Sequence, residues 1–184
     1  MVSTVEQVES ELRDFARLQA RAGLADADSQ RAEVAEAIRA ELPQQAANAE
    51  ILARAWLAKE YADLAAEAAS WPSPTDVDRL DAAFAECEAH QVLVLRGVAE
   101  PDATTTVAAA PEGLRGALWF APTDVWRAVD QGILATTLWR PDGRPAAVGE
   151  HLHTAVTGCL GRHGLAVRDA DGRVEVACRW QRRP

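Results

Sequence analysis

The segment WPSPTDVD, residues 71–78, constrains the fold most, because it separates two parts of the chain with different hydropathy patterns. Its two prolines end any helix that reaches them, since proline lacks an amide hydrogen and blocks the preceding turn. Thr75, with Asp78 three residues later, predicts the cap of a new helix. Strand-like runs occur only after this segment. We therefore expect a helical region over 1–72 and an α+β region over 73–184, packed together as one globular unit.

Apolar residues at helical spacing predict six helices, three before the boundary and three after it. Their expected ranges are about 4–22, 29–42, 46–70, 76–90, 123–130 and 146–163. Apolar or alternating runs predict strands at 92–98, 116–122, 133–139, 165–170 and 173–180. Asp171-Gly172 predicts a hairpin turn between the last two strands, and 99–115 is expected to be a polar loop or a short irregular segment. The expected class is α+β, with about four N-terminal helices packed with a sheet of about five strands and two further helices.

Length and composition predict a folded chain without a membrane span. The 184 residues are 48% hydrophobic, which is enough for a core. No stretch reaches the roughly 18 to 20 consecutive apolar residues that a spanning helix needs. The first residues are acidic, whereas a signal peptide begins with basic and then apolar residues. We expect a cytoplasmic protein that does not bind membranes.

The distribution of charge argues against nucleic acid as a partner. The net charge is −9, and residues 1–100 contain 19 acidic and 9 basic residues, against 9 and 10 in residues 101–184. Affinity for DNA or RNA comes largely from clustered lysine and arginine, and an acidic surface repels phosphates. The partner is expected to be a protein or a small molecule, and a homodimer is left open.

The cysteines and histidines do not have the spacing of metal ligands. Cys87, Cys159 and Cys178 are far apart, form no C-x-x-C pair and lie on the apolar faces of their predicted elements, where the pKa of a thiol rises. His151 and His153 are two residues apart, which places them about 200° apart on a helix rather than on one face. We expect no metal site and no cofactor.

The order of several segments resembles an uncharacterised actinobacterial family, domain of unknown function family 6891. The resemblance rests on RAGL (21–24), WPSPTDVDRLDAAFAECEAH (71–90), ALWFAPTDVWRAVDQGIL (117–134), and HGLAV with the terminal RWQRR. It covers nearly the whole chain, and W-P-x-P-T-D-x-D-R-L-D-A-A-F is its most specific part. The resemblance implies a fold and an origin but no activity.

The sequence departs from that family at two places. The resemblance implies a Cys-rich segment after the first strand, but RGVAEPDATTTVAAAPEG contains no cysteine. It also implies a His or Gln shortly before the residue that matches Asp124, where this chain has Ala121 and Pro122. The resemblance therefore does not carry any thiol or metal chemistry over to this chain.

Six tryptophans are the unusual feature of the composition, and tryptophan is common both in cores and in binding surfaces. Trp56, Trp71 and Trp180 are expected in the core. Trp126 lies beside the apolar face of its short helix, and Trp139 ends a strand before a polar turn. The residues predicted to form a partner- or ligand-binding surface are Asp124, Trp126, Trp139, Arg140, Arg144 and His153.

No sequence motif identifies a catalytic site: there is no G-x-S-x-G nucleophile elbow and no glycine-rich loop that opens a helix. The leading hypothesis is a non-enzymatic binding or accessory protein that recognises a protein partner. One alternative is a small enzyme with a pocket between the sheet and the 146–163 helix, in which Asp124 acts as base and His153 or Arg140 orients a substrate. The other alternative is a small-molecule-binding protein with a pocket near Asp124 and Trp126.

Overall fold

The computed structural model describes residues 4–184, and the chain divides into two compact units. The first unit comprises the residues up to Trp71 together with Arg182–Pro184, and the second is Pro72–Gln181. None of the helices within residues 4–184 is both long enough and apolar enough to cross a bilayer.

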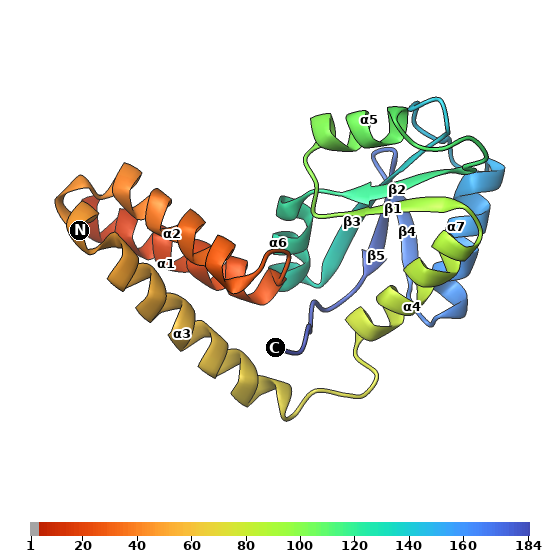
Figure 1. The fold of residues 1–184 in the computed structure, drawn as a ribbon. Helices are drawn as coiled ribbons and strands as arrows, with labels where there is room; N and C mark the ends of the chain where they lie inside the picture. The colour runs from red at the N-terminus through yellow and green to blue at the C-terminus, as the bar shows by residue number, and fades with distance from the viewer. Residues whose placement is uncertain (1–3) are drawn as a thin grey trace. The chain divides into compact units, whose positions relative to one another are not determined.

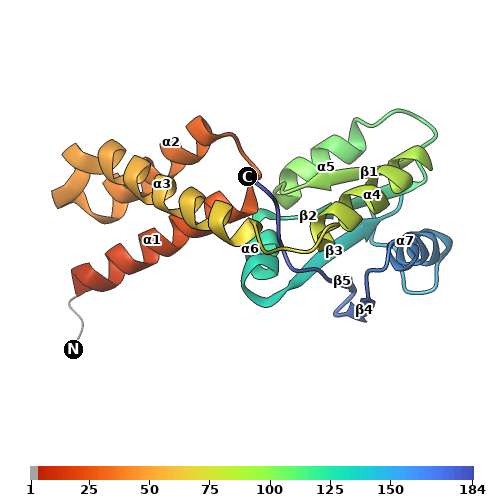
Figure 2. The ribbon, with the colours of Figure 1, turned by 90° about the horizontal axis from the view of Figure 1, so that it is seen from below.

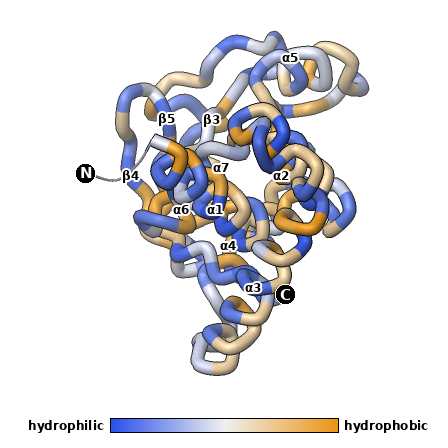
Figure 3. Tube along the Cα trace, turned by 90° about the vertical axis from the view of Figure 1, so that its left-hand side faces the viewer, coloured by the Kyte–Doolittle hydropathy of each residue, from blue (hydrophilic) through white to orange (hydrophobic). Residues whose placement is uncertain are grey.

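Three helices form the first unit, and each contacts the other two. They are α1 (Thr4–Ala22), α2 (Ala27–Glu41) and α3 (Ala49–Ala68), with the short 3₁₀ helix η1 (Pro43–Asn48) between the last two. Hydrophilic and hydrophobic residues are interspersed along these helices (Figure 3), and all three helices contribute apolar side chains to one buried cluster. The Asp26 side chain accepts hydrogen bonds from the Asp28 and Ser29 amides and so caps α2.

Small side chains let these helices approach closely. Ala16, Val34 and Ala53 are fully buried, and Trp56 fills the remaining space at 7% exposure. The expectation that Trp56 and Trp180 belong to the core is confirmed, because both are buried. Trp71 is only half-buried, at the end of the helical unit rather than in its centre.

The second unit contains a five-stranded mixed sheet with helices on both faces (Figures 1 and 2). The strand order is β1-β2-β3-β5-β4, with β1 and β2 parallel and every other pair antiparallel. The elements in chain order are α4 (Asp76–Ala89), β1 (Val92–Arg96), α5 (Glu100–Ala108), β2 (Gly116–Phe120), α6 (Pro122–Gln131), β3 (Ile133–Trp139), α7 (His151–Arg162), β4 (Val167–Ala170) and β5 (Arg173–Ala177). The expected α+β class, with N-terminal helices and a sheet of five strands, is confirmed.

Different helices cover the two faces of the sheet. On one face the Phe84 ring of α4 stacks on the Phe120 ring of β2 with 5.9 Å between centroids. On the other face Trp119 and Trp139 meet at 5.0 Å between centroids and pack with Val107 of α5. Alternate residues of β2 point to opposite faces, which explains why all five residues of this strand are buried.

The expectation of a loop at 99–115 is wrong, because α5 occupies Glu100–Ala108. Thr104, Thr105 and Thr106 are poor helix formers by propensity. Each nevertheless donates its hydroxyl hydrogen to the carbonyl four residues earlier, at 2.8–2.9 Å. Two adjacent parallel strands need a crossover, which is usually a helix, so the parallel pairing of β1 and β2 accounts for a helix here.

The expected helix at 146–163 begins five residues later, at His151. Gly149 has φ +85°, which a right-handed helix cannot contain, and Pro145 forms a bridge with Trp139 instead. Val148, whose apolar side chain suggested an inward face, is therefore 62% exposed in the loop before α7.

Candidate functional site

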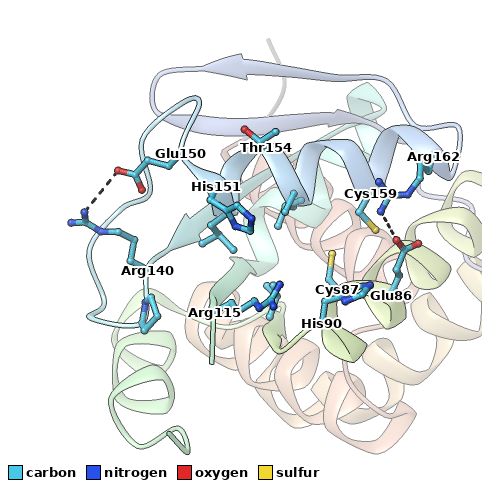
Figure 4. Close-up of a pocket in the computed structure, with 15 residues that line it drawn as sticks. Glu86, Cys87, His90, Arg115, Arg140, Glu150, His151, Thr154, Cys159 and Arg162 are labelled. Atoms are coloured by element: carbon cyan, nitrogen blue, oxygen red, sulfur yellow. Dashed lines mark hydrogen bonds and ion pairs between the residues drawn. The ribbon is translucent and has the colours of Figure 1, made fainter. Parts of the chain in front are cut away.

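A pocket of about 670 Å³ lies in the second unit between the first helix of that unit, α4, and α7 (Figure 4). Its apolar lining includes Val92, Leu152 and Val156. Volumes of about 300 to 1,000 Å³ are typical of sites for small molecules. The pocket is therefore large enough for a ligand of that class.

The topology of the sheet brings the polar wall of the pocket together. β1 and β2 are parallel, and Val92 at the start of β1 pairs with Gly116 at the start of β2. β3 is antiparallel to β2 and ends at Trp139. Arg115, directly before β2, and Arg140, directly after β3, therefore emerge at the same end of the sheet, where both line the pocket.

Gly116 allows the sheet to meet the first turn of α7. A Cβ at this position would lie 2.4 Å from Leu152 Cδ2 and 2.5 Å from the Trp139 carbonyl oxygen, and the glycine has φ +154°. Such contacts are too short for any side chain. Only glycine fits here, and the amide of the neighbouring Arg115 is held by a hydrogen bond of 2.9 Å to the Gln91 carbonyl.

Most of the charged groups around the pocket are paired. The Arg162 guanidinium binds Glu86, and Arg140 lies 3.8 Å from Glu150 through its Nη1. The Arg115 guanidinium, by contrast, forms no hydrogen bond or ion pair with any residue in the described part of the chain. The Arg115 guanidinium is thus a positive charge at the pocket without a negatively charged partner among the described residues.

Two imidazoles complete this polar wall. His90 ends α4, and His151 begins α7; both line the pocket (Figure 4). Within residues 4–184 neither imidazole has a hydrogen-bonding partner. Each can donate to a ligand through one ring nitrogen and accept through the other.

Two thiols lie between α4 and α7 (Figure 4). Burial, followed by the neighbouring Cys159, raises the pKa of the Cys87 thiol to about 12. Burial also raises the pKa of the Cys159 thiol, whose hydrogen points to the Ala83 carbonyl at 3.4 Å. The prediction that all three cysteines are buried is confirmed, and burial raises the pKa of Cys178 to about 12 as well. These thiols are weak nucleophiles at neutral pH.

A cluster of possible metal ligands lies beside these thiols. Single donor atoms of Glu86, Cys159 and His163 all lie within 4.8 Å of one another. Glu86 Oε2 is 2.8 Å from His163 Nε2, while Arg162 holds Glu86 Oε1. Arg162 and then His163 lower the pKa of the Glu86 carboxyl to about 2. The spacing of residues along the sequence could not predict this cluster. Glu86 comes from α4, whereas Cys159 and His163 come from the end of α7.

Asp124 does not line this pocket. It lies in the first turn of α6, where its Oδ2 accepts the Ala121 amide hydrogen at 2.8 Å. Asp124 therefore caps a helix whose N-cap residue, Ala121, has no polar side chain. Both carboxylate oxygens of Asp124 also accept hydrogen bonds from the Arg173 guanidinium, at 2.7–2.8 Å. Arg173 in turn contacts the Ala135 carbonyl on β3. These contacts of Asp124 and Arg173 link α6 to β3 and β5.

The two tryptophans of the predicted surface have different positions. Trp126 is half-buried on α6 and does not line the pocket. Trp139, which the sequence suggested for a binding surface, is only 6% exposed and packs on Trp119. The physical reason is α5, which the sequence did not predict and which covers this face of β3. Trp139 therefore belongs to the core.

The remaining three predicted residues are also separated. Arg140 lines the pocket, whereas the Arg144 side chain is 76% exposed in the loop before α7. His153 is buried, with its Nε2 2.6 Å from Asp169 Oδ1 and its Nδ1 accepting the Gly149 amide hydrogen at 3.3 Å. These contacts link α7 to β4 and leave neither ring nitrogen free for a ligand.

Sequence reasoning missed Arg115 and His90, and it considered His151 only as a metal ligand. These residues share no spacing along the chain, since they lie at the start of β2, the end of α4 and the start of α7. Their only common signal is a position at the boundary of a predicted element, where polar side chains are usual.

Comparison with known proteins places the chain in a family without an assigned activity. No curated protein and no solved structure gives a significant match. One family model matches over residues 5–184, which is nearly the whole chain, and its description is a domain of unknown function. The chain therefore belongs to the family DUF6891.

Proposed function

We propose that the protein binds a small organic molecule that carries an anionic group, a carboxylate or a phosphate. The observation that carries this proposal is the unpaired Arg115 guanidinium beside a pocket of about 670 Å³ with an apolar lining. The other charged groups in the lining are already paired, so the ligand supplies the missing negative charge.

The two parts of the lining suit the two parts of such a ligand. An apolar body would lie against Val92, Leu152 and Val156. The anionic group would meet Arg115, whose planar guanidinium can give two parallel hydrogen bonds to a carboxylate or a phosphate. His90 and His151 are placed to hydrogen-bond further oxygens of the ligand.

This proposal is favoured over the protein partner that the sequence suggested. That hypothesis relied on either the acidic N-terminal helices or an edge around Trp126 and Trp139. The burial of Trp139 removes one of the two tryptophans from the second of these surfaces. The enzyme alternative relied on Asp124 as a base, but both of its oxygens are bound to Arg173.

We also propose that the protein acts in the cytoplasm and does not bind nucleic acid. The three cysteines are free and buried, as is usual in a reducing compartment. The net charge of −9 disfavours contact with a phosphate backbone.

Nuclear magnetic resonance can locate the binding site with simple probes. We would titrate the ¹⁵N-labelled full chain with benzoate and phenyl phosphate, and in parallel with their neutral counterparts benzamide and phenol. The amides of Val92, Arg115, Leu152 and Thr154 should shift with the anions and much less with the neutral compounds. Arg115→Met should abolish this difference, while Arg144→Met, in the same part of the chain but outside the lining, should preserve it. Equal shifts with anions and neutral compounds would refute the proposal.

A further inference from the structure

We propose that Glu86, Cys159 and His163 bind a zinc ion at the end of the pocket where α4 meets the last turn of α7. This site goes beyond the proposed anion binding and does not depend on it. Glu86 and Cys159 line the pocket, so the ion would be accessible from it.

The three donor atoms are already close to the arrangement that zinc needs. They lie within 4.8 Å of one another, and the closest pair, Glu86 Oε2 and His163 Nε2, is 2.8 Å apart. In a tetrahedral site with bonds of about 2.0 to 2.3 Å, neighbouring donors are about 3.3 to 3.8 Å apart. Small side-chain rotations would therefore admit the ion between them.

The types of donor favour zinc over harder cations. A thiolate, an imidazole and a carboxylate are all ordinary zinc ligands, whereas magnesium and calcium prefer oxygen alone. A single cysteine or an acidic cluster would not have this selectivity. The combination of sulfur, nitrogen and oxygen in one cluster points to zinc or a similar transition metal.

The surrounding residues orient the carboxylate. Arg162 binds Glu86 Oε1, and this leaves Oε2 directed at His163. Hydrogen bonds of this kind to the oxygen that does not bind the metal commonly fix the orientation of a ligand. The Arg162 side chain is 62% exposed, so water can screen its charge from the ion.

Three protein ligands leave one position of a tetrahedral ion vacant. Because two of the ligands line the pocket, this position would face the pocket, as it does in zinc sites that bind water or substrate. Cys87 lines the same region beside Cys159. When zinc binds, the Cys159 thiol loses its proton to solvent and coordinates as a thiolate.

Cobalt(II) substitution tests this site directly. The reduced full chain should bind one equivalent of Co²⁺, with the near-ultraviolet charge-transfer band of a cobalt–thiolate bond and the intense visible bands of four-coordinate cobalt. One equivalent of Zn²⁺ should remove both signals. Cys159→Ala should abolish the charge-transfer band.

His163→Gln should weaken Co²⁺ binding at least tenfold, and because this side chain is 27% exposed the variant should fold normally. Cys178→Ala, which removes a buried thiol outside the cluster, should leave the spectrum unchanged. Far-ultraviolet circular dichroism establishes that each variant is folded. Absence of the charge-transfer band in the wild-type chain, or full affinity in His163→Gln, would show that the cluster is only a network of hydrogen bonds and ion pairs.

Discussion

Replacing Trp139 by alanine should destabilise the second unit strongly, although the sequence alone suggested a residue of a binding surface. Trp139 is 6% exposed and ends β3 under α5, with its ring 5.0 Å from that of Trp119. Truncation would leave a cavity between the sheet and α5, and it would remove the ring contact with Trp119. The cost therefore has a packing component and an aromatic component.

The expected magnitude follows from the buried area. A buried tryptophan removes about 150 to 250 Å² from water, which at about 25 cal/mol per Å² corresponds to about 4 to 6 kcal/mol as an upper bound. Tryptophan-to-alanine changes in cores typically cost about 3 to 5 kcal/mol. We therefore expect a loss of about 4 kcal/mol for Trp139→Ala. Trp126→Ala, at a half-buried position, should cost less than about 2 kcal/mol.

Urea unfolding of the full chain, followed by far-ultraviolet circular dichroism, measures both losses without depending on tryptophan fluorescence. Because the chain contains two compact units, hydrogen exchange of the β2 and β3 amides should report the stability of the second unit separately. If the alanine variant does not fold, Trp139→Phe should still show a smaller loss of about 1 to 2 kcal/mol. A cost for Trp139→Ala no larger than that for Trp126→Ala would refute the packing of α5 on the sheet.

Three further changes test other parts of the structure. Asp124→Asn should lower the free energy of unfolding by about 2 kcal/mol in urea melts, because it breaks the paired contacts with Arg173, and it should leave pocket binding intact. Arg168 lowers the pKa of Glu175, so this carboxylate stabilises the fold above its ordinary pKa near 4.5 and loses that effect as pH falls below it. Wild type should therefore exceed Glu175→Gln in stability at pH 7, and the difference should shrink in melts at successively lower pH. Cys87, whose pKa is raised to about 12, should react with a thiol reagent much more slowly in the folded chain than in urea; fast labelling of native protein would contradict this.

Local signals in the sequence were sufficient for elements that are stabilised locally. Residues 4–22 and 133–139 form the helix and the strand that their periodicity predicts. The Asp171-Gly172 turn was equally predictable, because both residues have the positive φ that a two-residue hairpin turn requires. In each case the local backbone conformation is determined by residues close together in the sequence.

The helix α5 was missed because its stability depends on the rest of the fold. Its three consecutive threonines suggest an irregular segment, and its packing partners lie on β2 and β3. That omission then affected the interpretation of Trp139, because α5 packs against it on this face of β3. Because α5 was missed, Trp139 was placed among the candidate site residues although it is buried beneath that helix.

Of the residues predicted for the site, only Arg140 lines the pocket, although one alternative placed a pocket beside the 146–163 helix. Its polar residues lie at the ends of different elements, and they come together because parallel β1 and β2 begin at the end of the sheet where β3 finishes. The parallel pairing cannot be read from strand periodicity. The cluster of Glu86, Cys159 and His163 is likewise formed by two helices that are distant in sequence.

The most direct test of the proposed function is a thermodynamic cycle between the charge of the ligand and Arg115. The dissociation constants of phenyl phosphate and phenol would be measured for wild type, Arg115→Met and the control Arg144→Met. We expect Arg115→Met to weaken phenyl phosphate binding at least tenfold, which corresponds to about 1.4 kcal/mol, and to change phenol binding less than about twofold. Arg144→Met should change neither. If Arg115→Met weakens both ligands equally, or weakens neither, the pocket does not recognise an anion through Arg115.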